Sequence, residues 1–377
     1  MKIAQIAPLI ESIPPEKYGG TERVISALTE ELVKRGHEVT LFASGDSQTR
    51  AKLFSIYHTS LRKAQVENLY GHNIWSLLNV GIAYQMQERF DIIHDHNSQN
   101  NPVSLPLANI SKVPVVMTLH GPLTDKYSKA FEFYRTPFLV SISQSQAAIA
   151  PNLHYIGNVY HGLHMKHYPF SEKHDGYLLF VGRIQIENGQ EEKGLHHAID
   201  IAQQTDMPLV IAAKLDESMP ENVRYFLEKI KPRLSDKIIW LGEVDEKERN
   251  TLMSHAYCLL HTVNFPEPFG LTLIEAMACG CPVLAFNKGS IPEVVEDGKT
   301  GFVVNTTQEA IQVIPQIATI KRDYCRHYAL QRFNASRMAD EYEKIYQTIL
   351  LDKSGRESRK LQSLSSSKII LPHKRSL

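Results

Sequence analysis

The stretch that decides the fold is the first one, residues 3–43, IAQIAPLIESIPPEKYGGTERVISALTEELVKRGHEVTLFA. A short apolar run at 3–7 has the length of a buried strand, and a similar run returns at 39–43. Between them, residues 21–35 have the apolar spacing of an amphipathic helix, and Gly36 can end it with positive φ. The apolar face of this helix contains Val24, Ile25, Leu28, Leu32 and Val33. Strand, helix and strand in this order predict a βαβ unit with parallel strands.

The same alternation continues along the chain. Further strand-like runs, separated by segments long enough for helices, occur at residues 91–94, 113–119, 138–143, 177–181, 209–213, 238–241, 257–261, 282–286 and 301–304. This pattern predicts the α/β class, with two doubly wound, Rossmann-like domains that face each other across a cleft. Ligands of such sheets gather beyond the carboxyl ends of the strands, so the cleft is the expected site.

The domain boundaries follow from where the periodicity fails. Residues 160–171 show neither the helical nor the strand period and are the predicted linker. We therefore expect a first domain at 1–165 and a second at 166–332. The end of the chain, 351–377, is basic and serine-rich with little apolar periodicity, and we expect it to be a disordered tail.

Composition limits the classes of partner. The 377 residues include 41 basic and 41 acidic ones, so no global field attracts nucleic acid. A membrane contact is not indicated either, although the basic tail leaves one open. No signal peptide or membrane span is visible, which predicts a cytoplasmic protein. The cysteines form no CxxC pair and are expected to be small core residues: Cys258, Cys279, Cys281 and Cys325.

The strongest chemical signal is residues 265–283, FPEPFGLTLIEAMACGCPV. Glu267 lies in a proline-flanked loop, and Glu275 follows eight positions later in a predicted helix. Free backbone amides at the start of that helix form an anion site suited to a diphosphate. The residues that would supply this site are Phe269, Gly270, Leu271 and Thr272.

This segment resembles the E-x7-E signature of the retaining glycosyltransferases of family 4, the group 1 enzymes with the fold called GT-B. The flanking Pro-Phe-Gly and Gly-x-Pro-Val match as well. The resemblance implies that Glu267 contacts the transferred sugar and the β-phosphate side, and that Glu275 holds the ribose. The runs YGGTER at 18–23 and FASGDS at 42–47 look similar to the avilamycin-type group within the family.

A second match lies at the end of the predicted strand 177–181, where Arg183 follows Phe-Val-Gly. In the family, the corresponding arginine and a lysine pair with the donor diphosphate. Lys193 is one candidate for the lysine, although the insert 185–192 lengthens its spacing from Arg183. Lys214, at the end of the next strand, is the competing candidate, and an ordinary solvated lysine stays open for either position.

The first domain carries sparser signals. Gly19 and Gly20 resemble the family's amino-terminal glycine loop, which lies against the donor phosphates and the acceptor. His120 ends a strand where the family places a histidine that faces the transferred sugar. The cluster at 94–96, His-Asp-His, looks like a metal or triad site, but an extended chain turns Asp95 away from its neighbours, which favours a structural or acceptor-loop role.

The resemblance covers residues 1–350 and implies a further helix, 333–350, that crosses back to the first domain. It also implies a retaining transfer from a nucleotide sugar, with a UDP-sugar favoured and GDP-mannose as an alternative. The acceptor is a saccharide, a lipid or a small molecule that the sequence does not identify.

No Asp-x-Asp motif is present, so no metal is expected, and no Gly-x-Gly-x-x-Gly follows the first strand, so no cofactor is expected. A sugar-nucleotide epimerase of similar fold and a non-catalytic nucleotide-sugar-binding protein are the alternatives. An epimerase would turn over its donor without an acceptor.

Overall fold

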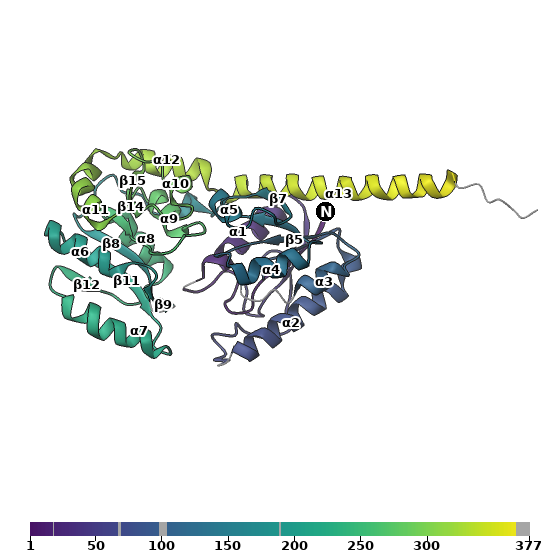
Figure 1. Ribbon diagram of the computed structural model, residues 1–377, viewed down its shortest axis with the longest axis horizontal. Helices are drawn as coiled ribbons and strands as arrows, with labels where there is room; N and C mark the ends of the chain where they lie inside the picture. Colours follow the sequence, from purple (N-terminus) through teal and green to yellow (C-terminus); the bar gives the residue numbers. More distant parts are fainter. Residues whose placement is uncertain (18, 67–68, 98–103, 188–189, 367–377) are drawn as a thin grey trace, which may run out of the picture.

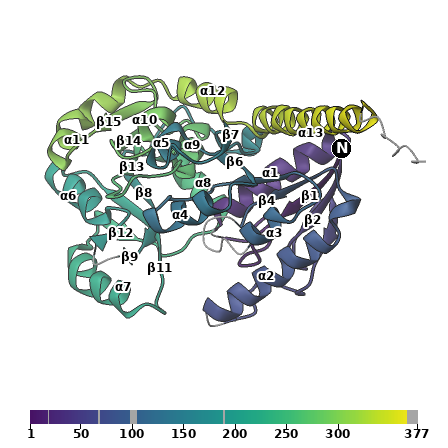
Figure 2. The same cartoon turned by 45° about the vertical axis from the view of Figure 1, so that its right-hand side comes forward.

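A computed structural model shows the fold and describes residues 1–17, 19–66, 69–97, 104–187 and 190–366 (Figure 1). It confirms the predicted α/β class, because it contains two sheets of parallel strands, each flanked by helices, that lie side by side (Figures 1 and 2). Each sheet and its flanking helices are formed by one half of the chain. The last helix is the exception, because it follows the second half in sequence and packs on the first domain.

The first sheet has seven strands, and every neighbouring pair is parallel. Its order is β3 (Lys52–Phe54), β2 (Glu38–Phe42), β1 (Lys2–Ile6), β4 (Ile92–Asp95), β5 (Val115–Thr118), β6 (Phe138–Ser141) and β7 (Tyr155–Asn158). The helices between them are α1 (Gly20–Lys34), α2 (Leu69–Gln85), α3 (Leu105–Asn109), α4 (Asp125–Phe133) and α5 (Gln144–Ile149). The strand order reverses between β1 and β4, which creates a crevice at the carboxyl ends of these two strands.

The second sheet repeats this plan with six parallel strands. Its order is β12 (Ile238–Trp240), β11 (Leu209–Leu215), β8 (Leu178–Ile184), β13 (Cys258–His261), β14 (Val283–Phe286) and β15 (Gly301–Val304). Its helices are α6 (Leu195–Thr205), α7 (Pro220–Tyr225), α8 (Glu246–His255), α9 (Leu271–Ala278), α10 (Ile291–Val294), α11 (Thr307–Val313) and α12 (Arg322–Arg332). Here the order reverses between β8 and β13.

Three strand features were not predicted from the sequence. They are β3, β7 and a two-stranded antiparallel hairpin of β9 (Ile186–Glu187) and β10 (Gln190–Glu191). Both β3 and β7 lie at edges of the first sheet, and β3 has only three residues, so neither gives a long buried apolar run. The hairpin lies within the insert that was noted between Arg183 and Lys193.

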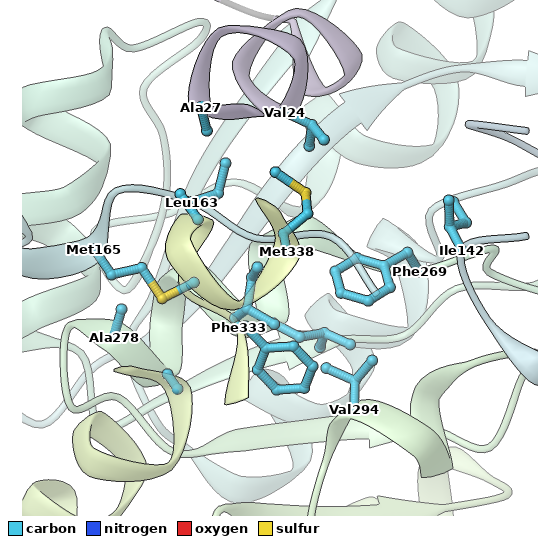
Figure 3. Close-up of a cluster of buried hydrophobic side chains, with 14 of the residues drawn as sticks. Val24, Ala27, Ile142, Leu163, Met165, Phe269, Ala278, Val294, Phe333 and Met338 are labelled. Carbon is cyan, nitrogen blue, oxygen red and sulfur yellow. The ribbon is translucent and has the colours of Figure 1, made fainter. Parts of the chain in front are cut away.

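The apolar core runs through the junction of the two domains. One cluster of buried side chains joins α1 and the first sheet to α9, α12 and the last helix (Figure 3). Phe269 from the second domain and Met338 from the last helix both lie in it, close to Val24 of α1 (Figure 3). Separating the domains would therefore expose apolar surface to water, and burial of this surface favours contact between the domains.

The last helix, α13 (Ala335–Ser366), packs on the first domain. Tyr342 and Tyr346 are buried, and the Tyr346 hydroxyl lies 2.6 Å from Nδ1 of His94. Over the described ranges, no helix combines the length and the apolar character that crossing a bilayer requires.

The sequence-based end of this helix at residue 350 was wrong, because α13 continues to Ser366. The reason is composition: lysine, arginine, glutamate, glutamine and leucine favour helices, and no proline interrupts the chain before Pro372. Residues 351–366, which were expected to be disordered, are therefore helical, and residues 367–377 lie outside the described residues.

Both connections between the domains pass through one point. The Leu163 N–H donates to the Phe333 carbonyl at 3.0 Å, and the Ala335 N–H donates to the Leu163 carbonyl at 3.0 Å. Gly162 makes this approach possible, since a Cβ atom there would lie only 2.4 Å from the Asn334 carbonyl oxygen.

We expect Gly162→Ala to lower the free energy of unfolding by about 1–3 kcal/mol, because the added methyl group would push the two chain segments apart. Gly81→Ala is the matched control: it lies in α2 with open space around it, so it should raise stability by about 0.5–1 kcal/mol. Urea unfolding curves measure both. A Gly162→Ala midpoint at or above that of the parent protein would contradict this view of the crossing.

Candidate functional site

A cleft of about 440 Å³ lies between the two domains, at the carboxyl ends of the strands next to both reversal points. The structure places all of the sequence-predicted site residues in its lining. From the first domain these are Gly19, Gly20 and His120; from the second they are Arg183, Lys193, Lys214, Glu267, Phe269, Gly270, Leu271, Thr272 and Glu275. A further hollow of about 360 Å³, beside Arg322, contains none of them.

The start of α9 forms the floor of the cleft on the second domain. Gly270 precedes the helix with φ of +81°, a conformation that glycine adopts without strain. The helix then starts at Leu271, so its first backbone amides have no partner within the helix. Of the predicted anion-site residues, Phe269 contributes backbone here, because its side chain is buried in the shared core.

Glu267 lies at the centre of a charged cluster. Its Oε2 atom is 2.9 Å from Nζ of Lys193 and 3.5 Å from Nε2 of His261. Burial alone would raise the pKa of this carboxyl, but Lys193 and His261 outweigh burial and lower the pKa to about 2. The loop itself is fixed, since the Ser290 N–H donates to the Glu267 carbonyl at 2.9 Å. Glu267 is therefore ionised and held in place at neutral pH.

The two candidate lysines occupy different positions. Lys193 pairs with Glu267, and its Nζ lies 4.5 Å from the centre of the Phe265 ring. Lys214 is the last residue but one of β11, and its Nζ lies 3.3 Å from Oε1 of Glu243, which also lines the cleft. The hairpin takes up the extra residues of the insert, so Lys193 still reaches the acidic residue of the signature.

Glu275 joins the two domains. Its side chain is 2% exposed, and its Oε1 atom contacts Arg23 from α1 of the first domain. Arg249 from α8 lies 3.0 Å from the same atom, and the Tyr168 hydroxyl donates to it at 3.3 Å. Two arginines from different domains therefore compensate one buried carboxylate.

The glycine loop of the first domain approaches α9 closely. A Cβ atom on Gly20 would lie 3.0 Å from Cδ1 of Leu271, and one on Gly19 would lie 2.7 Å from Cβ of Pro15. Small residues at these positions let α1 begin at the cleft, directly opposite the start of α9.

His120 follows β5 and lines the cleft from the first domain. Its Nε2 atom lies 2.8 Å from Nδ1 of His96, and its ring stacks on that of His161 at a centroid distance of 5.1 Å. Burial lowers its pKa from 6.5 to about 3, so the ring is neutral. Its Nδ1 atom is buried and has no hydrogen-bond partner among the described residues.

The His-Asp-His cluster at 94–96 does not form a triad. The rings of His94 and His96 lie 4.0 Å apart, whereas the Asp95 carboxylate accepts from the Asn97 N–H at 2.8 Å. His94 faces Thr118 of the first domain and Tyr346 of α13, which gives it a structural role.

Sequence reasoning missed several residues of the cleft. Arg249, His161 and His261 line it, and so does Glu22, whose pKa burial raises to about 7. His261 ends β13, and its position at a strand's carboxyl end was a usable signal. Arg249 lies in a helix with little apolar periodicity, so no pattern in the sequence indicates that its side chain points into the cleft.

Two family models match most of the chain. The model described as "Glycosyl transferases group 1" matches residues 166–333, and "Glycosyltransferase Family 4" matches residues 18–155. A curated relative is the N-acetyl-alpha-D-glucosaminyl L-malate synthase of Bacillus anthracis, which is 25% identical over 380 residues, covering 90% of this chain and 96% of the relative.

Solved structures share the two-domain architecture. A glycosyltransferase involved in avilamycin A biosynthesis, AviGT4, has a TM-score of 0.70 at 21% identity, covering 93% of this chain and 98% of that one. The Anabaena protein Alr3699/HepE, in complex with UDP and glucose, has a TM-score of 0.67 at 20% identity, covering 92% and 100%. At these identities the likeness shows the fold, which is GT-B.

The ion pairs predict different effects for the two lysines. We expect Lys193→Met to lower stability by about 1–3 kcal/mol, because it leaves Glu267 buried without its main partner. Lys214→Met, the matched control, should cost less than about 1 kcal/mol, because its pair with Glu243 is more exposed.

Urea unfolding at pH 7 measures this difference. The Glu267 pKa is depressed in the folded state, so the stabilisation exists above its ordinary value of 4.5 and should fade as the pH falls toward about 2. Equal losses for the two variants at pH 7 would contradict the assigned pairing.

Proposed function

The chain belongs to the group 1 glycosyltransferases of family 4, and we propose that it transfers a sugar from a nucleotide-sugar donor to a hydroxyl group of an acceptor. The observation that carries this proposal is that Arg183 and the start of α9 line the same cleft as the ion pair of Lys193 and Glu267. Together they offer cationic side chains and backbone amides beside an ionised carboxylate, within one cleft.

A donor diphosphate fits the cationic side of the cleft. Arg183 lies next to the carboxyl end of β8, and the first residues of α9 line the same crevice. Negative charge grows on the leaving diphosphate during transfer, so fixed cations and amides there stabilise the transition state. Lys193, already at the carboxylate of Glu267, is better placed than Lys214 to bridge the sugar and phosphate regions.

Glu267 and Glu275 would contact different parts of the donor. Glu267 lies just before the start of α9 and would accept hydrogen bonds from hydroxyls of the transferred sugar. Glu275 lies one turn into α9, and its Oε1 atom is held by Arg23 and Arg249, which orients the carboxylate to receive ribose hydroxyls. Only the first contact lies where charge changes during the reaction.

The acceptor would bind against the first domain, near His120 and Glu22. Approach of its hydroxyl from the same face as the leaving phosphate would give retention, with the phosphate taking the proton from that hydroxyl. Closure of the cleft would exclude water, which otherwise hydrolyses the donor. We favour a UDP-sugar as donor, because the Anabaena protein of the same fold was solved with UDP and glucose; GDP-mannose is the alternative.

We predict that Glu267→Gln lowers kcat by roughly 30- to 1000-fold while nucleotide binding changes little. The loss of a charged contact that tightens in the transition state costs about 2–4 kcal/mol in the barrier. Turnover assays beside calorimetric titration with UDP or GDP measure the two effects. Normal turnover by a Glu267→Gln protein that still binds nucleotide would show that the catalytic centre lies elsewhere.

Glu275→Gln should behave in the opposite way. A ribose contact made equally in the ground and transition states affects binding, so affinity should fall by about 1.5–3 kcal/mol with a smaller effect on kcat. This change also leaves Arg23 and Arg249 short of negative charge, so circular dichroism must show that the variant is folded. A folded variant with unchanged nucleotide affinity would remove Glu275 from the ribose site.

We further propose that the reaction needs no divalent ion, because Arg183, Lys193 and the α9 amides supply the positive charge. Activity should therefore survive an excess of EDTA. Loss of activity with EDTA, followed by its recovery with Mg²⁺ or Mn²⁺, would refute this proposal.

A further inference from the structure

We propose that Gln5 and His96 are positioning residues that hold His120, a residue of the cleft lining, in a single tautomer, with Nε2 protonated and the buried Nδ1 left as an acceptor for a substrate hydroxyl. The inference rests on the proposed function for the identity of that hydroxyl, which belongs to the transferred sugar or to the acceptor. The tautomer itself follows from contacts inside the first domain.

The chain of contacts begins at Gln5, which is fully buried in β1. Its Oε1 atom lies 2.5 Å from Nε2 of His96, and its Nε2 atom lies 3.4 Å from the Tyr346 hydroxyl. In this orientation the amide nitrogen donates to the Tyr346 hydroxyl oxygen, and Nδ1 of His94 lies 3.5 Å from the same nitrogen. An amide oxygen can only accept, so Nε2 of His96 must carry a hydrogen.

The contacts of Tyr346 are compatible with this orientation of the amide. Its hydroxyl lies 2.6 Å from Nδ1 of His94, and Nε2 of His94 lies 2.7 Å from Oγ1 of Thr118. When Tyr346 donates to His94, its oxygen is available to accept from Gln5, and His94 donates to Thr118. Every contact in the network is then satisfied with one direction of donation.

The hydrogen-bond contact from His96 to His120 follows the same direction of donation. Burial lowers the pKa of His96 well below its usual value, so the ring is neutral and carries only one hydrogen. Because that hydrogen is on Nε2, Nδ1 of His96 is an acceptor. His120 lies 2.8 Å away through its Nε2 atom, which must therefore donate.

His120 is also neutral, so its remaining nitrogen, Nδ1, has no hydrogen. Nδ1 is buried, and no described residue makes a hydrogen bond to it, although the side chain lines the cleft. A buried acceptor of this kind costs free energy unless a partner arrives. A substrate hydroxyl that donates its hydrogen to Nδ1 satisfies this requirement.

Stacking keeps the His120 ring in this orientation. The His161 ring lies nearly parallel to it, with an interplanar angle of 23°, and Phe269 from the second domain meets His161 edge-on at 5.0 Å. A half-turn of the His120 ring would place Cε1 where Nε2 now faces His96 and would break that bond, and a tilt of the ring would break the stack. The network thus connects strand β1 to a histidine that lines the cleft.

The direct test is the tautomer of His120 in the whole protein. Long-range ¹H–¹⁵N NMR spectra of protein labelled at its histidines distinguish a bare ring nitrogen from a protonated one, and the signal missing from His120→Gln identifies the residue. We expect a bare Nδ1 and a protonated Nε2. A protonated Nδ1 in the parent protein would overturn the proposal, whatever the variants do.

Variants at position 96 test how the direction is imposed. His96→Phe keeps a ring but removes both nitrogens, so it should allow the other His120 tautomer and lower kcat by about 10-fold with little change in the donor KM. His96→Gln carries one donor and one acceptor and should restore most of the lost kcat. His154→Phe, at an exposed position, is the matched control and should leave the His120 signal unchanged.

A folded His96→Phe protein that keeps the original tautomer and turnover would contradict the role of His96. The NMR result does not depend on the donor or the acceptor. A protein with the expected tautomer that transfers no sugar would therefore count against the proposed function and leave the positioning role intact.

Discussion

The Glu275 carboxylate, buried between an arginine of each domain, is the interaction on which the cleft depends. An isolated carboxylate whose side chain is 2% exposed would be very costly, and Arg249 and Arg23 together compensate it. Because Arg23 belongs to α1, this compensation requires the first domain to lie against α9. The same contact brings Gly20 next to Leu271, so the two helix starts define one site.

The rest of the architecture supports this close contact between the two domains. Both sheets reverse their strand order, and both reversal points open toward the cleft, so one domain can present cations and the other a neutral histidine. The connections at Leu163 and Phe333 run side by side, and α13 anchors the first domain through Tyr342 and Tyr346. A cleft whose connections lie at one point can close without breaking either sheet.

The fold could be predicted from the sequence because buried parallel strands are continuous apolar runs. The edge strands β3 and β7 could not, since they are short or only half-buried. Within the site, the E-x7-E signature identified Glu267 and Glu275 from the sequence, but the residues that pair with them come from distant parts of the chain. Arg23 and Glu275 are 252 positions apart, and only the folded chain shows that they meet. The ion pair of Lys193 with Glu267 likewise could not be predicted, because it depends on how the hairpin folds.

Nucleotide binding by the parent protein tests the central claim most directly, through unfolding measured with UDP, GDP and ADP in turn. The account predicts that one of them, at 100 times its dissociation constant, adds about 2.7 kcal/mol to the free energy of unfolding. Arg183→Ala should abolish this gain, whereas Arg233→Ala, which breaks a pair with Asp200 outside the cleft, should keep it. No gain with any of the three nucleotides, or an undiminished gain in Arg183→Ala, would contradict a donor site in this cleft.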